Sequence, residues 1–414
     1  MKNNLLIFLK LTILGLIVGF VIAGYQFIGH EIIELSEFLL NSKNLIWVLT
    51  IVIAVLLLFG IMVINNKYPG YYGGGIPQIE GYHRGWYNFS AYKMIALMTI
   101  NSLFAFFGGF LLGSEGPSIS IGSSLGMIAN DIFKREDKDD IAIAGSSGFA
   151  CAFSSPLAGF CHLLEENKNI ISLKLIFKGI YVIGISFIIS YLLYPHSLLP
   201  YLEIEILPIK FYVFILLLTF LSLVVSKLFI TLVIKMKDMT KGTKIMVYLT
   251  PILLVLFMML RRYAPILIGN GIDSLNVTIV DYSLAIILCI FIFRLICTMF
   301  SLNSNMSGGL VLPTLAIGSL ISILLVKVVS YFIPEITEYT YIFLICGMLI
   351  TFAFVTNAPI TAFVLGLKCA PIKVIILPLL LSLGISFLSI NMFKFENIYH
   401  KLEKRLPGYI ELKH

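Results

Sequence analysis

The sequence predicts an all-α protein that crosses a membrane many times. Of its 414 residues 59% are hydrophobic and only 12% are charged, and the mean hydropathy is +0.99. A soluble domain carries about 25% charged residues. Apolar runs recur that match the roughly 20 residues a helix needs to cross a bilayer, as in Leu11–Ala23, Leu45–Ile64, Phe211–Ile234 and Leu284–Phe300. Because these runs are continuous rather than alternating, they indicate helices and exclude a transmembrane β-barrel.

The first element, Lys2–Ala23, has a basic start and an apolar stretch, as a signal peptide does. No small-residue cleavage site followed by a soluble domain appears, so we interpret it as the first membrane helix. Lysines cluster between later apolar runs, at 235–244 and again at 394–405. By the positive-inside rule these segments face the cytoplasm, and the connector around 195–210 suits the outer side. The net charge of +7 is therefore a topology signal and does not indicate nucleic-acid binding.

Gly/Pro clusters interrupt several of the apolar segments. They occur at 72–77, 113–117, 154–159, 307–313 and 356–361. Broken backbone is tolerated inside a membrane where it lines a cavity enclosed by protein. Broken half-helices that meet near the midplane are typical of the binding site of a secondary transporter.

A weak internal repeat divides the chain into two halves. Residues 149–160 read FACAFSSPLAGF and residues 352–363 read FAFVTNAPITAF, and each stretch follows a Gly-rich motif that ends in proline. Chance similarity between apolar segments is the alternative. We expect a first membrane repeat with its N-terminal helix at 1–240, a second repeat at 241–391, and a cytoplasmic-side helix at 392–414 that carries Tyr399.

An ionisable residue lies in one of the Gly-rich motifs. Residues 113–122 read GSEGPSISIG, and Pro117 suits the first turn of a helix, where a missing N–H is tolerated. Free backbone amides and the positive end of the helix dipole then make an anion site, and Glu115 lies where an anion would lie. A carboxylate there would compete with the ion when charged and leave when protonated. The alternative is a simple N-terminal cap, but ionisable residues inside membranes are functional candidates by default.

The same construction occurs twice more. Residues 73–77 read GGGIP and residues 307–313 read SGGLVLP, each ahead of an apolar segment. Each motif alone is weak evidence, because Gly and Pro also mark ordinary turns. Three such helix starts in one membrane chain would let three dipoles converge on one dehydrated anion.

These motifs resemble those of the CLC family of chloride channels and chloride/proton antiporters over almost the whole chain. GGGIPQIEG is similar to the family's GSGIP loop, GSEGPSISIG to its GREGP loop, and GGLVLP to its GxFxP loop. The resemblance implies a homodimer with one pore per subunit, each built from two inverted repeats of tilted and broken helices. It also implies that Glu115 is the external gating glutamate and that the amides of Leu310 and Val311 bind the central anion. The other residues implied to contact chloride are Gly74, Gly75, Ile76, Ser114, Gly116 and Tyr399.

Two further segments carry the resemblance. AGFCHLLEE, which ends at Glu166, resembles the segment that holds the antiporters' internal proton-transfer glutamate, and ENIYH resembles the segment that presents a tyrosine hydroxyl, here that of Tyr399. Proton-independent members commonly lack an acid at the first position, so Glu166 favours antiport. From the residues alone, Glu165 and Glu166 could be a solvated helix end, and Tyr399 could be an interfacial aromatic.

The sequence also departs from the family pattern. The family serine of the first loop is Gly74, the arginine of the second is Ser114, and the phenylalanine of the third is Val311. Lys368 stands where an acidic residue often follows the second Pro-broken helix. Gly74 removes a hydroxyl from the anion and puts the selectivity in doubt, while Ser114 removes a positive charge from the outer mouth. No soluble domain follows Tyr399, so we expect no nucleotide-binding regulatory pair.

Other features have less weight. Gly145–Gly148 matches the GxSG of intramembrane serine proteases, but we expect close helix packing instead, since His162 lies too near in sequence to be on a separate helix. The six cysteines lie in apolar segments and are expected to be buried and inert. Arg294 is expected to pair or to snorkel near a helix end.

We therefore predict an inner-membrane transporter that exchanges chloride for protons, embedded in the lipid bilayer and acting on no nucleic acid. No metal, nucleotide or prosthetic group is expected. The alternative within transport is an uncoupled channel for chloride or for another anion, such as nitrate or fluoride. The remote alternative is the protease.

Overall fold

The structure is a computed structural model that describes residues 2–43, 45–166, 171–197, 199, 201–202, 204–241, 243–269, 280–392 and 396–406. Within these residues the chain is helical, and the only strand-like contact is a bridge between Gly113 and Gly309. The elements are α1 (Lys2–Leu40), α2 (Ile46–Lys67), α3 (Ile76–His83), α4 (Ala91–Phe107), α5 (Glu115–Ile132), α6 (Lys138–Ala152), α7 (Pro156–Glu166), α8 (Leu173–Leu193), η1 (Ile209–Phe211), α9 (Tyr212–Thr240), α10 (Ile245–Tyr263), η2 (Pro265–Leu267), α11 (Leu284–Asn303), α12 (Val311–Ser330), η5 (Pro334–Tyr339), α13 (Thr340–Thr356), α14 (Pro359–Cys369), α15 (Ile372–Met392) and α16 (Ile398–Glu403).

The multi-pass prediction is confirmed. In the described part of the chain nine helices are long and apolar enough to cross a membrane, and α1 includes the predicted first membrane helix. Two spans differ from the rest in burial. The most apolar windows of α12 and of η5–α13 are 83% and 89% buried inside the protein, whereas the other seven are 28–39% buried. The spans α12 and α13 therefore form the centre, and the others leave apolar faces for lipid.

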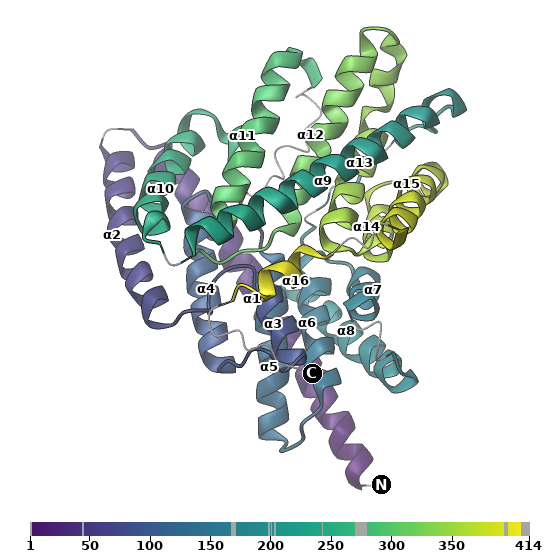
Figure 1. Cartoon of the computed structure of the whole chain (residues 1–414). Coiled ribbons are helices and arrows are strands. Elements are labelled where there is room, and N and C mark those ends of the chain that lie inside the picture. Colours follow the sequence, from purple (N-terminus) through teal and green to yellow (C-terminus); the bar gives the residue numbers. More distant parts are fainter. Residues whose placement is uncertain are drawn as a thin grey trace.

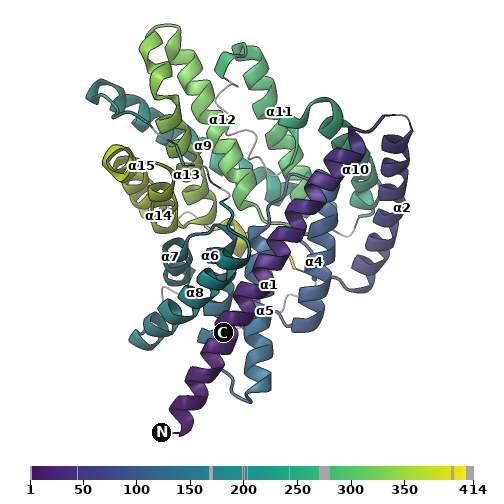
Figure 2. The same ribbon diagram turned by 180° about the vertical axis from the view of Figure 1, so that it is seen from behind.

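Two helices start side by side in the middle of the molecule and run to opposite sides. The bridge between Gly113 and Gly309 places the start of α5 next to the start of α12. From there α5 runs toward the bottom of the view in Figure 1 and α12 toward the top. Helix α1 crosses the far face diagonally, over α4 and α5 (Figure 2). The short helix α16 lies near the centre, beside α3 (Figure 1).

The two halves pack their central helices in the same way. In the first half α5 packs against α6, and in the second half α12 packs against α13. Both contacts depend on glycine, because a Cβ at Gly122 would lie 2.3 Å from the Ala144 carbonyl oxygen, and one at Gly318 would lie 2.2 Å from that of Gly347. Small residues at these positions let the backbones approach closely. Each pair is followed by a helix that begins at a proline, α7 at Pro156 and α14 at Pro359.

Helices α7 and α14 contact each other at the junction of the halves, and a charged side chain near the end of each helix bonds to backbone groups there. The Glu165 carboxylate, at the end of α7, accepts hydrogen bonds from the Ile360 amide at 2.8 Å and the Thr361 amide at 2.9 Å, and from the Thr361 hydroxyl. Lys368, near the end of α14, donates to the carbonyls of Phe153 and Ser154, at 2.8 and 3.0 Å. Each charge lies at the helix end that the helix dipole favours.

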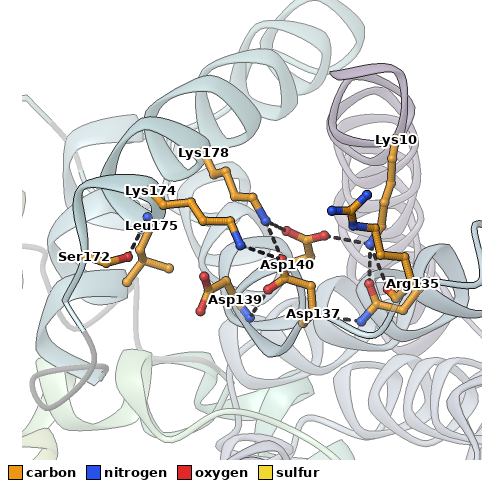
Figure 3. A network of polar contacts seen from close by, with 10 residues as sticks. Lys10, Arg135, Asp137, Asp139, Asp140, Ser172, Lys174, Leu175 and Lys178 are labelled. Carbon is orange, nitrogen blue, oxygen red and sulfur yellow. Dashed lines mark hydrogen bonds and ion pairs between the residues drawn. The ribbon is translucent and has the colours of Figure 1, made fainter. Parts of the chain in front are cut away.

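A buried charge network fixes α1 against α6 and α8 (Figure 3). Asp140 accepts from Lys10 at 2.7 Å and from Lys178 at 2.7 Å, and the Lys10 and Asp140 side chains are 1% and 3% exposed. Lys178 also contacts Asp137 at 2.7 Å, and the more exposed Lys174 contacts Asp137 at 3.2 Å. The three helices come from distant parts of the sequence, so this network was not predicted.

Two predictions about polar groups in apolar runs have different outcomes. Arg294 is 1% exposed and donates to the carbonyls of Ile266, Ile268 and Gly269, so it pairs with backbone instead of snorkelling. Of the six cysteines Cys289 is exposed and Cys161 is half-buried, which corrects the expectation that all are buried. A helix that faces lipid keeps apolar residues on its outer face, so an apolar run does not by itself predict burial in protein.

Candidate functional site

The three Gly-rich loops meet at the centre of the protein. The amide of Gly308 donates to the Gly73 carbonyl at 3.0 Å, which joins the first loop to the third. The amides of Gly113 and Gly309 donate to each other's carbonyls at 2.8 and 2.6 Å, which joins the second loop to the third. The loops lead directly into α3, α5 and α12. The positive ends of three helix dipoles therefore converge, as the sequence predicts.

Glycine is required where the first loop touches the second. A Cβ at Gly116 would lie 2.1 Å from the Gly74 carbonyl oxygen. Gly75 has a φ of +80°, and a Cβ there would lie 2.0 Å from the Ser120 hydroxyl. Neither position has room for a side chain, so glycine is what allows the two loop backbones to pack in direct contact. Ile76, at the start of α3, packs its side chain into the core.

Glu115 lies at the junction of the second and third loops. Its side chain is fully buried. One carboxylate oxygen lies 2.1 Å from where a Cβ of Gly113 would be and 2.7 Å from where one of Gly309 would be, so the side chain folds back over both glycines. The carboxyl faces the backbone amides of Glu115 itself and of Leu312. The amide of Leu312 belongs to the first turn of α12, so the carboxyl lies at a helix N-terminus, where neither of its oxygens has a hydrogen-bond partner among the described residues.

The first turn of α12 supplies further amides. Leu310 is the N-cap residue and Val311 is the first residue of the helix, and both side chains are buried at 1% exposure. Backbone N–H groups at this position have no partner within the helix. The structure therefore places Leu310 and Val311 next to Glu115, at the junction where the resemblance puts the central anion.

Tyr399 approaches the same region from α16. Its side chain is 3% exposed, and its hydroxyl is buried without a hydrogen-bond partner in the described part of the chain. It interacts electrostatically with the carboxyls of Glu166, Glu115 and Glu80. A buried hydroxyl normally has a partner, so this donor fits an anion. The alternative reading of Tyr399 as an interfacial aromatic does not fit its burial.

Glu166, at the end of α7, lines a separate cavity of about 240 Å³, which we name the glutamate cavity. Glu80, His83 and Arg84 of the α3 segment also line it, as do residues of α5 and α6. Its neighbour Glu165 is not solvated, which corrects one reading of this pair, because Glu165 caps α14 and is 8% exposed. The two adjacent glutamates therefore have different surroundings.

Two further cavities lead toward the loops. The inner cavity, of about 370 Å³, is lined by Gly73 and Gly74 and by the basic side chains of Lys237, Lys241 and Arg405. The outer cavity, of about 270 Å³, is lined by Ser114 and Gln26 and, in the connector after α8, by Tyr194, His196 and Ser197. The first contains residues predicted to face the cytoplasm, and the second contains residues predicted to face outward.

Ser114, which replaces the family arginine, is held by α1. Its hydroxyl donates to the Gln26 side-chain oxygen at 3.0 Å, and the Gln26 side-chain nitrogen donates to the Ser118 hydroxyl at 3.0 Å. A neutral hydrogen-bond network therefore stands at the outer mouth in place of the missing positive charge.

The protease reading required a serine and a histidine on separate helices. His162 does lie on a separate helix, α7, which corrects the expectation from its position in the sequence. It approaches Ser146 of α6 at 3.3 Å and stacks on Phe149. The serine of the GxSG motif is however Ser147, whose hydroxyl donates to the Ile143 carbonyl of its own helix at 2.8 Å. The motif serves close helix packing, because a Cβ at Gly148 would lie only 2.2 Å from the Ser118 carbonyl oxygen of α5.

Three charged residues of the site region were not singled out from the sequence. Glu80, Arg84 and Glu403 lie together where α3 meets α16. A signal for Glu80 was present, because it lies within the motif GGGIPQIEG, in a segment where an ionisable residue is a functional candidate. Arg84 and Glu403 are 319 residues apart and carry no local signal.

Three converging helix starts, a carboxylate at their junction and cavities on either side define a membrane protein that moves anions. The chain belongs to the voltage gated chloride channel family, whose model matches residues 57–390. It is 28% identical over 396 residues to a protein of Vibrio parahaemolyticus serotype O3:K6 named H(+)/Cl(-) exchange transporter ClcA, covering 90% of this chain and 83% of the relative. A protein of the same name from Salmonella arizonae is 26% identical over 412 residues, covering 94% and 86%.

Solved structures have the same fold. The crystal structure of a slow cyanobacterial Cl-/H+ antiporter superposes with a TM-score of 0.83 at 22% identity, covering 96% of this chain and 97% of that one. A CLC-type fluoride/proton antiporter superposes with a TM-score of 0.73 at 16% identity, covering 94% and 97%. These likenesses establish the CLC fold for this multi-pass membrane protein.

Proposed function

We propose that the chain exchanges chloride for protons across the cell (inner) membrane. The observation that carries this proposal is the position of Glu115, whose carboxyl lies against the first turn of α12 and against the glycines of two loops. A carboxylate in an anion site competes with the anion, and a protonated carboxyl does not. One side chain thereby links the binding of a proton to the passage of an anion. The relatives named as H(+)/Cl(-) exchange transporters support the assignment.

The anion would be held by neutral groups that donate hydrogen bonds to it. The amides of Leu310 and Val311 and the converging loop amides of Gly74, Gly75 and Gly116 surround the junction, and the buried Tyr399 hydroxyl donates from the inner side. Neutral donors bind a dehydrated chloride ion without fixing it so firmly that it cannot leave. When Glu115 is protonated and turns away, its place at the start of α12 is free for chloride.

The proton would reach Glu115 from the cytoplasm through Glu166. This residue lines the glutamate cavity, which is separate from the inner cavity at Gly73 and Gly74. Two different cavities allow the proton and the anion to approach the junction by different paths. Glu165 takes no part, because its carboxylate is fully engaged at the start of α14.

The arrangement of the halves belongs to the same proposal. The divergence of α5 and α12 from one junction supports two repeats of opposite orientation, within 1–240 and 241–391, followed by the segment 392–414 with Tyr399. We further propose a homodimer in which each subunit has its own pore. Light scattering of the purified protein in detergent tests this assembly, and a monomeric mass would contradict it.

The function is tested with purified protein in chloride-loaded liposomes, with chloride and proton fluxes recorded together. The wild-type protein is expected to pump protons when a chloride gradient is applied. Glu115→Gln, which mimics the protonated gate, is expected to pass chloride and to pump no protons. Proton pumping by Glu115→Gln at the wild-type rate would contradict the role of Glu115. Chloride flux without any proton flux in the wild type would instead identify an uncoupled channel.

A further inference from the structure

The helix that carries Tyr399 is too short to hold its own position. Helix α16 spans Ile398–Glu403, and isolated helices below about 12 residues are marginal in water. Its N-terminus is capped by the Asn397 side chain, which accepts from the Tyr399 amide at 2.8 Å. The helix packs against α3, α9 and α13. The position of the Tyr399 hydroxyl therefore depends on these contacts.

One ion pair joins α16 to the end of α3. The Arg84 guanidinium contacts the Glu403 carboxylate at 2.6 Å, and the Glu403 side chain is fully buried. Room for this carboxylate comes from Gly81, where a Cβ would lie 3.4 Å from the second Glu403 oxygen. The N-cap residue of helix α3 is Gly75, in the first Gly-rich loop. The ion pair thus connects the helix of the loop with the helix of Tyr399.

The pair lies among other titratable groups. On α3, Glu80 contacts Arg84 at 3.6 Å and interacts electrostatically with Glu166 of α7 and with Glu403. On α16 itself, His400 contacts both Glu403, at 3.1 Å, and Arg84, and Lys404 follows the helix. Helix α13 has no charged residue. On α9 the nearby charges are Lys237 and Asp238, and Asp238 pairs with Arg405.

A single arginine therefore faces carboxyls from two helices, and the burial of Glu403 makes its charge sensitive to pH. Burial raises the pKa of Glu403 to about 7, and the positive charges of Arg84 and Lys404 only partly oppose this. As the pH falls through this value the carboxylate is protonated and the ion pair is lost. A neutral hydrogen bond is about half as strong as one between charged groups.

We propose that Arg84 and Glu403 act as positioning residues that hold Tyr399 at the inner side of the anion site, and that protonation of Glu403 releases this hold. The proposal rests on the proposed function, because it assigns to Tyr399 a contact with chloride. It gives the transporter a control on anion binding from the cytoplasmic side that is separate from the gate at Glu115. Neither residue touches the anion.

The test measures chloride binding by calorimetry in protein carrying Glu115→Gln, so that the gate itself does not titrate. At pH 8 the added change Glu403→Gln is expected to weaken binding by up to about tenfold, since a charged pair becomes a neutral one. At pH 6 the two proteins are expected to bind equally, because Glu403 is then mostly protonated and, like the glutamine that replaces it, carries no charge. Equal binding at both pH values, or the same weakening at both, would overturn the proposal.

A double-mutant cycle separates positioning from general destabilisation. On a Tyr399→Phe background, Glu403→Gln is expected to have no further effect on chloride affinity at pH 8. Full additivity of the two changes would overturn the proposal. Glu396→Gln is the matched control. Glu396 precedes α16, is 56% exposed and pairs with Lys401 of α16 at 3.6 Å, so this change is expected to leave chloride affinity unaltered.

A second variant covers the case in which Glu403→Gln does not fold. Arg84→Lys keeps the charge but loses the forked geometry of the guanidinium. It is expected to weaken binding at pH 8 and to leave binding at pH 6 unchanged, and an unchanged affinity at pH 8 would overturn the proposal. Absence of chloride binding by the Glu115→Gln protein at every pH would overturn the proposed function together with the positioning role.

Discussion

Gly74→Ser tests the sharpest departure of the first loop from the family pattern, and the structure shows that the change is sterically possible. A Cβ at Gly74 would have only ordinary contacts, 3.7 Å to the Pro77 ring and 3.9 Å to the Gly308 carbonyl oxygen. Its φ does not lie in the left-handed region, in contrast to Gly73 and Gly75 on either side. The glycine at 74 is therefore not needed for the backbone, and its replacement adds a hydroxyl beside the loop junction.

The size of the effect follows from the bond the hydroxyl would make. A hydrogen bond to a charged partner contributes about 1.5–3 kcal/mol. The Gly308 carbonyl competes for the same hydroxyl, and fixing the side chain costs entropy, so we take the lower end. About 1.4 kcal/mol corresponds to a tenfold change. Gly74→Ser is thus expected to tighten chloride binding about tenfold, with coupling through Glu115 unchanged.

Calorimetry with chloride measures this change, and the neighbouring glycine provides the control. Gly75→Ser places a side chain at a φ of +80° and 2.0 Å from the Ser120 hydroxyl. It is expected to displace the loop and weaken binding. If folded Gly74→Ser protein binds chloride no more tightly than the wild type, the first loop does not reach the anion in the way described here.

The remaining predictions concern the charged groups around the site. Glu166→Gln is expected to stop proton flux in liposomes while chloride flux continues, and its melting temperature should stay near that of the wild type. Glu165→Ala is expected to keep proton coupling and to lower the free energy of unfolding by about 1–3 kcal/mol, because three hydrogen bonds to α14 are lost. Similar behaviour of the two variants would contradict both roles. Asp140→Asn leaves the buried ammonium groups of Lys10 and Lys178 without their shared carboxylate, and it is expected to lower the free energy of unfolding by about 3–5 kcal/mol in denaturation experiments. The control Asp139→Asn should be near neutral, and equal stability of the two variants would refute the account of the network.

The sequence was sufficient for the membrane class, the approximate spans and the meeting of the three loops. Long apolar runs have few alternatives in a bilayer, because lipid enforces helices. The loops were predictable because glycine next to proline restricts the backbone to few conformations, and Glu115 stood out because a charge is rare in such a segment. These signals are local in the sequence, and they are the ones that predicted the site.

The contacts between distant segments could not be predicted. Lys10 and Asp140 are 130 residues apart in sequence, and nothing near either residue identifies the other. The same holds for Arg84 and Glu403, and for the capping of α14 by Glu165, which from sequence could be a solvated helix end. Partner choice for a buried charge depends on how the helices pack, and that information is spread over many weak contacts.

The paired hydrogen bonds between Gly113 and Gly309 bear on which parts of the protein have to move during transport. They join the two halves of the molecule next to the Glu115 carboxylate. The halves therefore cannot separate at this point without breaking these backbone hydrogen bonds. In the proposed mechanism the Glu115 side chain is the group that moves there. If Glu115 is the gate, as proposed, its opening requires a change of side-chain torsion angles and no separation of the two halves.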